Sequence, residues 1–442
     1  PVIKYEAAPH GLQLDLDWEY AKKYGLCLKN ADGTPYQITE MWFGNSLIPD
    51  FTNPETKRWW LDCRRYLVEE LGVAGFKTDG GEFLFDPDAR FSDGRSVAEA
   101  HNAFPNLYES VYHELTNVTF SRAGYTGAQK YPIHWAGDQL STFAELKGQL
   151  TAGLSAGLSG VPFWGFDIGG FAGDFPSTEL YLRSAALAAF APVMQFHSEP
   201  RGGQYYMVQR NHWNNDRSPW NMALANRDES IVPIYRLFAN LRMNLLLYLW
   251  QEAQHCSRTL RPMMAHLVYD YPQDANVLHL EDEYLLGRSL LAAPVIDEGA
   301  AEREVYLPDG LWHTLWTGKA QPGGQSVRVS CPLTEMPVFV RDGTALPLNL
   351  NDALIMGTTE PSGAVNRTDG YENLCFLLFG AHGESRFRDE LGNDLTLRWQ
   401  NGEIQTEGTL TCPVTVLADF LTDGVTAELF GRTVYGIRKE PR

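Results

Sequence analysis

Residues 73–79 (VAGFKTD) carry the pattern that decides the fold, because an apolar run stops abruptly there at Asp79. The pattern returns at residues 117–122 (NVTFSR), 161–167 (VPFWGFD) and 193–197 (VMQFH), where each run again meets a polar residue. Near-continuous apolar runs of this length are typical of parallel strands that are buried on both faces. The runs therefore predict a parallel sheet whose strand ends carry polar side chains.

The segments between these runs carry the signals of helix starts. Residues 52–55 (TNPE) place an N-cap residue before a proline, residues 142–145 (TFAE) spell a capping box, and residues 177–179 (STE) open a third helix. The first of these helices is expected to extend to Leu71, the last apolar residue at helical spacing. Strands that alternate with helices are typical of an α/β fold, and we predict a (β/α)8 TIM barrel.

The pattern changes after about residue 280. Residues 284–286, 304–307, 326–329 and 338–340 are short strand-like runs separated by Pro-Asp-Gly, Gly-Gly or Asp-Gly turns. Such runs are typical of antiparallel sheet. A seam at residues 349–351 precedes a further strand-rich stretch.

These changes predict three domains. The barrel is expected at residues 1–275, with strands three to eight of the barrel present in this chain. Two antiparallel β-sandwich domains are expected to follow, a proximal one at residues 276–350 and a distal one at residues 351–442.

The charge balance narrows the class of partner. The 442 residues include 36 Lys and Arg against 55 Asp and Glu, which gives a net charge of −19. A chain this acidic is poorly suited to nucleic acid or to an anionic membrane surface, and no apolar run approaches the ~20 residues of a membrane span. The six cysteines are far apart and form no CxxC pair, so we expect buried thiols rather than disulfides or a zinc site.

The polar residues at the strand ends are expected to meet at one end of the barrel, where barrel enzymes carry their active sites. Carboxylates among aromatic walls suit a sugar, whose ring faces stack on side-chain rings and whose hydroxyl groups need charged partners. Each residue alone has a plainer explanation as a helix cap, an ion-pair partner or a core side chain. Their occurrence together favours a functional site. The residues are Asp79, Glu82, Arg122, Asp138, Asp167 and His197.

Longer motifs around these residues resemble those of glycoside hydrolase family 31. Residues 76–82 (FKTDGGE) resemble its nucleophile segment, residues 121–124 (SRAG) and 129–138 (QKYPIHWAGD) its acid/base segment, and residues 164–171 (WGFDIGGF) another hallmark. The resemblance covers residues 1 to about 350. Connecting segments that extend it are residues 49–54 (PDFTNP), 287–294 (GRSLLAAP), 303–308 (REVYLP) and 337–343 (PVFVRDG).

The resemblance implies a role for each site residue. It implies that Asp79 is the catalytic nucleophile and Asp138 the general acid/base, while Glu82 stands where the family has an acid that orients its neighbour. The substrate-binding residues that it implies are Lys77, Arg122, Trp135, Trp164, Asp167 and His197.

The implied mechanism is a double displacement that retains the configuration of the sugar. It needs two carboxyl groups ~5–5.5 Å apart on either side of the anomeric carbon. Asp79 must be ionised, which cationic neighbours such as Lys77 and Arg122 favour, whereas Asp138 must hold a proton, which an apolar wall such as Trp135 favours. No metal or organic cofactor is expected.

The family normally has a β-sandwich and the first two barrel strands ahead of the point where this sequence begins. A barrel that lacks strands has open edges and an exposed core. We therefore expect the missing N-terminal portion of the same protein to be a partner of this chain, and a homo-oligomer is left open. The six barrel strands visible here lie near Val2, Val73, Val118, Ile133, Val161 and Val193.

The leading function is an exo-acting, retaining α-glycosidase that removes terminal α-linked glucose from oligosaccharides or glycosides. An α-xylosidase, an α-galactosidase or an α-glucosyltransferase stays open, because the family's sugar-reading acid on the first barrel strand lies outside this sequence. A non-catalytic carbohydrate-binding protein is a different class, and the presence of both Asp79 and Asp138 argues against it. The shortened start alone favours a structural fragment.

Overall fold

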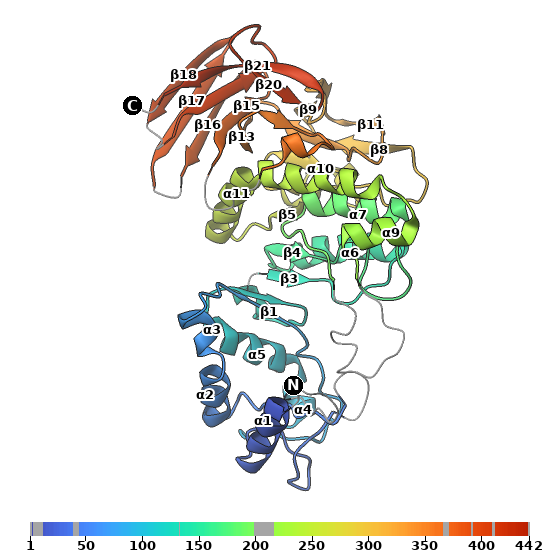
Figure 1. The fold of residues 1–442 in the computed structure, drawn as a ribbon, viewed down its shortest axis with the longest axis vertical. Helices are drawn as coiled ribbons and strands as arrows, with labels where there is room; N and C mark the ends of the chain where they lie inside the picture. The colour runs from blue at the N-terminus through green and yellow to red at the C-terminus, as the bar shows by residue number, and fades with distance from the viewer. Residues whose placement is uncertain are drawn as a thin grey trace. The chain divides into compact units, whose positions relative to one another are not determined.

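A computed structural model describes residue 2 and residues 12–38, 44–131, 133–198, 216–365, 371–389, 392–408 and 412–440 (Figure 1). These residues form two units, and each is described by itself. The first unit ends at residue 137, and the second contains residues 138–198 and 216–440. No helix within these ranges has the length and apolar composition that a membrane span needs.

Short parallel strands form the sheet of the first unit. They are β1 (Phe76–Thr78), β2 (Thr119–Ser121) and β3 (Ile133–Trp135), and β2 pairs in parallel with both of the others. Helix α5 (Phe104–His113) connects β1 to β2 and packs on both strands. The parallel strands predicted from the apolar runs are thus confirmed here, although each strand is shorter than its run.

The other helices of the first unit lie in the segments before β1 and between β1 and β2, and α2 packs on α5. The start predicted at residues 52–55 is confirmed, since the Asn53 side chain accepts a hydrogen bond from the Glu55 amide at 2.9 Å. The helices are α1 (Leu12–Lys23), α2 (Pro54–Asp62), α3 (Arg65–Glu69) and α4 (Val97–Ala100), with the 3-10 turns η1 (His101–Ala103) and η2 (Ala128–Lys130).

The prediction of one helix from residue 54 to Leu71 is wrong, because α2 ends at Asp62 and α3 begins at Arg65. The Arg64 amide donates to the Leu61 carbonyl at 2.9 Å, as in a 3-10 turn. The Arg64 guanidinium meanwhile donates to the Trp60 carbonyl at 3.0 Å. The side chain thus takes the acceptor that the Arg64 amide would use in a continuous α-helix.

The core of the first unit is largely aromatic. The Phe51 ring stacks on Phe104 and Tyr108, with ring centroids 6.2 and 6.0 Å apart, and meets the edge of Trp60 at 5.6 Å. These contacts join the loop before α2 to α5, so they fix the wall beside the end of β1.

The second unit begins with helix α6, which strand β4 (Phe163–Gly165) and further helices follow. The helix starts predicted at residues 142–145 and 177–179 are confirmed. Thr142 accepts from the Glu145 amide, and Ser177 accepts from the Leu180 amide, both at 3.2 Å. The helices are α6 (Phe143–Leu158), α7 (Thr178–Ala189), α9 (Pro219–Asn226), α10 (Ile231–Asn244) and α11 (Leu246–Thr259).

Two β layers follow these helices. The proximal sheet has the strand order β10-β9-β12-β7-β6-β5, a separate pair joins β8 to β11, and all of these pairings are antiparallel. The strands are β5 (Met264–His266), β6 (Tyr284–Leu286), β7 (Leu290–Ala292), β8 (Glu302–Leu307), β9 (Leu311–Thr314), β10 (Ala320–Pro322), β11 (Gln325–Ser330) and β12 (Val338–Arg341), with the turns η3 (Leu267–Tyr269) and η4 (Ala275–Val277).

The distal part contains a sheet with the order β13-β15-β19-β21-β20-β14 and a three-stranded sheet, β16-β17-β18. The strands are β13 (Ala345–Leu350), β14 (Ile355–Met356), β15 (Asn373–Leu378), β16 (His382–Arg388), β17 (Asp394–Gln400), β18 (Glu403–Gly408), β19 (Val414–Ala418), β20 (Val425–Leu429) and β21 (Arg432–Lys439), with the turn η5 (Pro361–Gly363). Pairing is not purely antiparallel as expected, since β15–β19 and β14–β20 are parallel pairs.

The predicted barrel strand near Val2 lies largely outside the described residues, and the one near Val193 is not assigned as a strand. Val2 makes an isolated antiparallel bridge to Leu47, and residues 3–11 lie outside the described part of the chain. Near Val193 the pairing is reduced to one parallel bridge between Gln195 and Asp167. The segment still lies along its neighbour, because the Val193 amide donates to the Trp164 carbonyl at 3.2 Å and the Ile168 amide donates to the Gln195 carbonyl at 3.0 Å.

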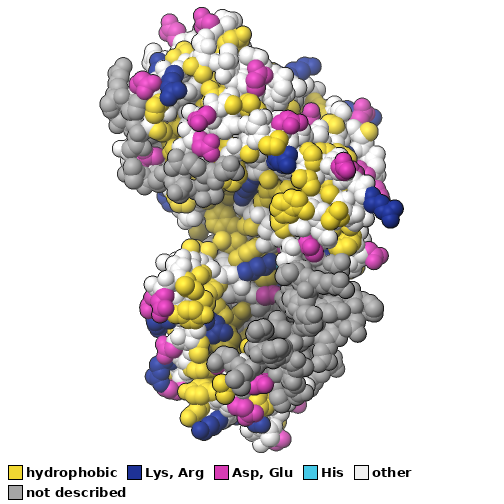
Figure 2. All heavy atoms as spheres, in the orientation of Figure 1, with side chains coloured by type: hydrophobic (Ala, Val, Ile, Leu, Met, Phe, Trp, Pro, Cys, Tyr) yellow, Lys and Arg dark blue, Asp and Glu magenta, His cyan; other side chains and the backbone are white. Residues whose placement is uncertain are grey.

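The domain boundaries predicted at residues 275 and 350 stay predictions. Strand β5 precedes the first boundary but pairs with β6, and β13 precedes the second boundary but pairs with β15. Figure 2 shows one face of the described residues, on which Lys and Arg side chains lie singly or in small groups among Asp and Glu side chains.

Candidate active site

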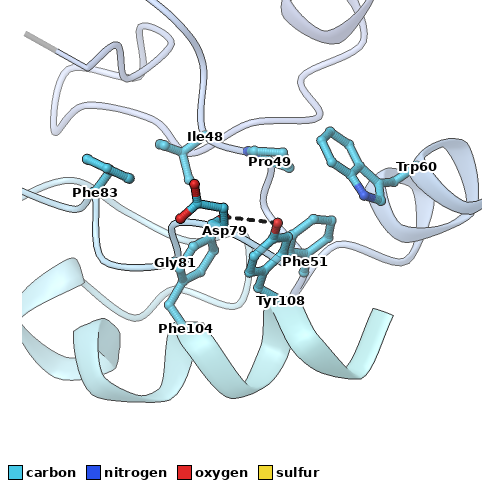
Figure 3. A pocket seen from close by; sticks show the side chains of 9 residues that line it. All are labelled: Ile48, Pro49, Phe51, Trp60, Asp79, Gly81, Phe83, Phe104 and Tyr108. Atoms are coloured by element: carbon cyan, nitrogen blue, oxygen red, sulfur yellow. Dashed lines mark hydrogen bonds between the residues drawn. The ribbon is translucent and has the colours of Figure 1, made fainter. Parts of the chain in front are cut away.

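Asp79 directly follows β1, where the backbone turns through Gly80 and Gly81, both with positive φ (80° and 99°). The Gly80 amide donates to Asp79 Oδ1 at 2.8 Å, and Arg122 Nη1 lies 3.2 Å from the same oxygen. The hydroxyl of Tyr108 donates to the Asp79 carbonyl at 3.1 Å (Figure 3). Among the contacts made by the described residues, both side-chain contacts use Oδ1, which leaves Oδ2 for another partner.

Arg122 follows β2 and joins two acids. Besides Asp79 it contacts Glu82, and its side chain is only 14% exposed, whereas those of Asp79 and Glu82 are 36% and 39% exposed. The guanidinium also lies over the Phe83 ring, 5.7 Å from its centroid. A planar guanidinium held between two carboxylates is a well-fixed charge, so Glu82 can orient Arg122 and Arg122 can orient Asp79.

Lys77 and Trp135 lie on the face of the sheet opposite to α5. The register pairs Lys77 with Phe120 and Phe120 with Ile133, and side chains alternate along each strand, so these residues share a face with Trp135. The Lys77 ammonium lies 4.4 Å from the centroid of the buried Trp135 ring and 5.4 Å from that of Phe120. The two predicted residues are thus brought together by a cation–π contact.

A hollow opens beside Asp79, and its other lining is almost entirely apolar (Figure 3). Asp79 is the one ionisable carboxylate among the described residues that line it. Rings of α2, of α5 and of the loops before and between them form the walls, so a ligand in this hollow would meet one carboxylate and several ring faces. The lining residues are Ile48, Pro49, Phe51, Trp60, Asp79, Gly81, Phe83, Phe104 and Tyr108.

Asp138 begins the second unit, where its side chain is exposed. The next residue, Gln139, is buried and holds the loop after β4. Its side-chain amide donates to the Asp167 carbonyl at 2.8 Å. Its backbone carbonyl accepts from the Phe171 and Ala172 amides. The backbone on the C-terminal side of Asp138 is therefore anchored to the loop that follows β4. Asp79 belongs to the first unit, so the predicted separation of the two carboxyl groups stays a prediction.

Asp167 follows β4 and is 1% exposed. Its charge acts on Arg217, a fully buried residue whose guanidinium donates to the Ser141 hydroxyl at 3.1 Å and to the carbonyls of Gly173 and Asp174 at 3.3 Å. Burial lowers the pKa of Arg217 to about 10, and the charge of Asp167 opposes that shift. The structure thus gathers Asp167, Arg217 and the loop after β4 into one cluster.

His197 lies at the edge of this cluster. Its ring centroid is 4.6 Å from that of Phe171, at an interplanar angle of 60°, and its carbonyl accepts from the Arg217 amide at 3.0 Å. The predicted residues Asp167 and His197 are therefore brought together in the second unit, with Arg217 between them.

Trp164 has a different environment. Its indole nitrogen donates to the Gln149 carbonyl of α6 at 3.1 Å. A Cβ atom at Gly153 would lie 2.5 Å from the ring, so α6 can approach β4 this closely only at a glycine. These contacts favour packing against α6, and the role of Trp164 as a wall of the sugar subsite stays a prediction that they do not support.

Three residues of these clusters were missed by the motifs. Arg217 follows a segment without hydrophobic periodicity. Gln139 directly follows Asp138, and the motif assigned a role only to the acid. Tyr108 lies on the side of α5 that packs into the core. Spacing alone cannot distinguish a tyrosine that bonds to a catalytic backbone from one that fills a core. Among the described residues, His, Cys, Asp and Glu side chains form no group of three or more that could hold a metal ion.

Family comparisons match most of the chain. The model of the glycosyl hydrolases family 31 TIM-barrel domain matches residues 13–252, and that of the family 31 C-terminal domain matches residues 260–346. An isomaltosyltransferase from Sporosarcina globispora is 40% identical over 386 residues, or 86% of this chain and 34% of the relative. A 1,3-alpha-isomaltosidase from Kribbella flavida is 42% identical over 323 residues, or 72% of this chain and 44% of the relative. The chain thus spans less than half the length of these relatives.

Two solved structures that are similar to this chain are enzymes that form or degrade cycloalternan. The cycloalternan-forming enzyme from Listeria monocytogenes, in complex with a pentasaccharide substrate, has a TM-score of 0.85 and 33% identity, covering 99% of this chain and 44% of that one. The cycloalternan-degrading enzyme from Trueperella pyogenes, in complex with a covalent intermediate, has a TM-score of 0.70 and 36% identity, covering 78% and 47%.

Proposed function

This chain belongs to glycoside hydrolase family 31, and we propose that it carries the catalytic residues of a retaining α-glycosidase that acts on α-linked glucose. Glycosidase or transglycosylase activity follows from the family and its relatives. The finer proposal concerns this chain's own residues: Asp79 as nucleophile, Asp138 as acid/base, and Lys77, Arg122, Trp135, Asp167 and His197 as sugar-binding or bracing residues.

In the proposed reaction, Asp79 Oδ2 attacks the anomeric carbon while the bond from that carbon to the leaving oxygen breaks. Asp138 gives its proton to that oxygen, and a glycosyl ester of Asp79 forms. Asp138, now ionised, then takes a proton from water, which attacks the same carbon and releases Asp79. A sugar hydroxyl in place of water would give transfer instead of hydrolysis.

The observation that carries the proposal is the way in which Asp79 is held. Its Oδ1 is fixed by the Gly80 amide and by Arg122, and Arg122 is fixed in turn by Glu82. A nucleophile gains from such orientation, because a reacting atom held near its attack position loses less entropy on the way to the transition state. A purely structural aspartate would not need one oxygen anchored and a hollow beside it.

The substrate proposal draws on the relatives. Two of them are named for isomaltosyl groups, and the similar solved enzymes form or degrade cycloalternan. We therefore extend the expected substrates from a terminal α-linked glucose to an α-linked isomaltosyl group, with transfer as the second candidate reaction. The covalent intermediate captured in the Trueperella pyogenes enzyme supports the double displacement.

The test is release of nitrophenol from a panel of aryl α-glycosides: glucoside, isomaltoside, xyloside and galactoside. Products are separated by chromatography to distinguish free sugar from longer transfer products. We expect turnover of the glucoside or the isomaltoside by the chain together with its N-terminal portion, and loss of turnover in Asp79→Ala. The exposed Asp88, which lies on the loop after β1, gives the matched control Asp88→Ala, which should keep full activity.

Three results of this assay would each contradict part of the proposal. Turnover that survives in Asp79→Ala would remove Asp79 as the nucleophile. Turnover of the xyloside or galactoside alone would replace the proposed sugar. Folded protein that is silent on the whole panel, even with the N-terminal portion present, would contradict the glycosidase proposal.

A further inference from the structure

The peptide unit that joins Asp79 to Gly80 is held at both of its polar groups. Its amide, on Gly80, donates to Asp79 Oδ1 at 2.8 Å. Its carbonyl, on Asp79, accepts from the Tyr108 hydroxyl at 3.1 Å (Figure 3). The orientation of this one peptide plane therefore decides whether the amide faces the carboxyl oxygen that Arg122 also contacts.

The backbone itself does little to fix this plane. Asp79 lies just beyond the strand register, whose last pair between β1 and β2 joins Thr78 to Ser121. Gly80 has a φ of 80°, and a glycine adopts positive and negative φ about equally readily. Opposite rotations about ψ of Asp79 and φ of Gly80 could therefore flip the plane at little cost. A flip would turn the Gly80 amide away from Oδ1 and break the bond from Tyr108.

Tyr108 is well placed to oppose such a flip, because its own ring is fixed on α5. The ring stacks on Phe51, with centroids 6.0 Å apart at an interplanar angle of 12°, and meets Tyr112 edge-on at 5.4 Å. A Cβ atom at Gly81 would lie 3.5 Å from the ring, so the loop after β1 passes close to it. Burial raises the pKa of Tyr108 well above its ordinary value, and the charge of Asp79 adds to the shift. The hydroxyl therefore keeps its proton and stays a donor at neutral pH.

We propose that Tyr108 is a positioning residue, whose hydroxyl fixes the Asp79–Gly80 peptide so that the Gly80 amide holds Oδ1 and Oδ2 is presented for attack. This inference rests on the proposed function of Asp79. Tyr108 also lines the hollow beside Asp79, where a ring that served only as a wall would act on substrate binding. The two roles are separable, because a misplaced nucleophile lowers kcat whereas a lost wall contact raises KM.

The test compares Tyr108→Phe, which removes the hydroxyl and keeps the ring contacts, with the matched control Tyr284→Phe. Tyr284 is a fully buried residue of the second unit, and its hydroxyl donates to the Phe190 carbonyl at 2.7 Å. Both variants thus remove the same kind of bond. Assayed with the N-terminal portion present, Tyr108→Phe should lower kcat by about tenfold with KM within about twofold, since small misplacement slows the chemical step. Tyr284→Phe should keep both constants.

A rescue variant separates the bond from the packing of the ring. Replacement of Tyr108 by 4-aminophenylalanine keeps the ring and supplies an N–H donor in place of the hydroxyl. We expect kcat to recover to within about threefold of wild type, because a donor to the Asp79 carbonyl is restored. A rescue variant as slow as Tyr108→Phe would overturn the proposal.

A second readout does not depend on turnover: hydrogen–deuterium exchange of the Gly80 amide, resolved by fragmentation of the peptides. Exchange should be faster in Tyr108→Phe than in wild type and in Tyr284→Phe, because the amide opens more often once its peptide plane is released. Unchanged exchange at Gly80, a rise in KM with kcat unchanged, or an equal loss of kcat in Tyr284→Phe would each overturn the positioning role. A wild type without turnover would contradict the proposed function of Asp79, and the exchange comparison would still decide the role of Tyr108.

Discussion

The Asp79–Arg122 pair of the first unit and the Asp167–Arg217 pair of the second unit combine the same types of side chain in opposite surroundings. The side chains of Asp79 and Arg122 are 36% and 14% exposed, and they lie beside a hollow. Asp167 and Arg217 are 1% and 0% exposed, and the Arg217 guanidinium is satisfied by a hydroxyl and two backbone carbonyls.

The difference shows what each pair can do. An accessible carboxylate with one anchored oxygen can meet a substrate and still return to the same position. A buried arginine that bonds to backbone carbonyls instead fixes loops, and its charge needs a nearby acid because an uncompensated buried charge is costly. The first pair is therefore fitted for reaction, and the second for holding the loop after β4 in place.

The largest expected effect comes from the accessible pair. Asp79→Asn keeps the shape of the side chain but removes the nucleophilic charge, so we expect kcat to fall by at least ~10⁴-fold. Stability should change by less than about 1 kcal/mol, because partly exposed ion pairs contribute little. Kinetics on the aryl glycoside and urea denaturation measure the two effects. A large stability loss with residual turnover would reverse the roles assigned to the two pairs.

The buried pair should show the opposite balance. Arg217→Met leaves Asp167 without its cationic neighbour and the carbonyls of Gly173 and Asp174 without their donor. We expect a loss of about 3–5 kcal/mol in the free energy of unfolding. The matched variant Arg122→Met should lose less, because the acids that it leaves, Asp79 and Glu82, are 36% and 39% exposed and water can solvate them. Similar losses in the two variants, measured by urea denaturation, would show that burial does not separate the pairs.

The sequence predicted the accessible pair far better than the buried one. Asp79 and Arg122 each follow an apolar run directly, so strand ends and parallel register bring them together. Arg217 reaches its cluster through the packing of distant segments, since Ser141 lies 76 positions away. No local pattern encodes such a contact, and the motifs gave Arg217 no signal.

The same distinction applies to the fold. Helix starts at Asn53, Thr142 and Ser177 follow from local side-chain bonds, and the sequence predicted all three. The break between α2 and α3 depends on a contact of the Arg64 side chain, and the parallel pair β15–β19 depends on strands that are not neighbours along the chain. Local signals predicted the elements, but long-range contacts set their ends and partners.

The next expected effect is a dependence of stability on pH, which arises from one buried carboxyl group in each unit. Burial raises the pKa of Glu109 and of Glu283 to about 8, and for Glu283 the charge of Arg303, 3.4 Å away, opposes that rise. The folded state holds these protons at a pH where the unfolded state has lost them. Stability should therefore be highest below the unfolded pKa of about 4.5 and fall as the pH rises toward 8.

Each carboxyl should contribute a slope of up to about 1.4 kcal/mol per pH unit in that range. Glu109→Gln should remove its share, so that the variant gains stability relative to wild type as the pH rises. Glu283→Gln is the comparison in the second unit, and it also leaves Arg303 with one acid fewer. Urea denaturation at pH 5, 6, 7 and 8 measures the slopes, and parallel curves for wild type and Glu109→Gln would contradict the neutral buried carboxyl.

The smallest expected effect is the loss of stability when a helix N-cap is removed, and it tests whether the same local hydrogen bond contributes equally in the two units. Asn53 caps α2 in the first unit and Ser177 caps α7 in the second, each by accepting from a backbone amide. Asn53→Ala and Ser177→Ala should each cost about 1 kcal/mol, because both leave one amide of the first turn without its acceptor. Asn53→Asp and Ser177→Asp keep the acceptor and should cost much less. Urea denaturation measures these losses. A much larger loss at one cap would mean that the surrounding unit, and not the hydrogen bond, determines the loss of stability. The contrast between the two Asp–Arg pairs would then reflect general differences between the units rather than the burial of each pair.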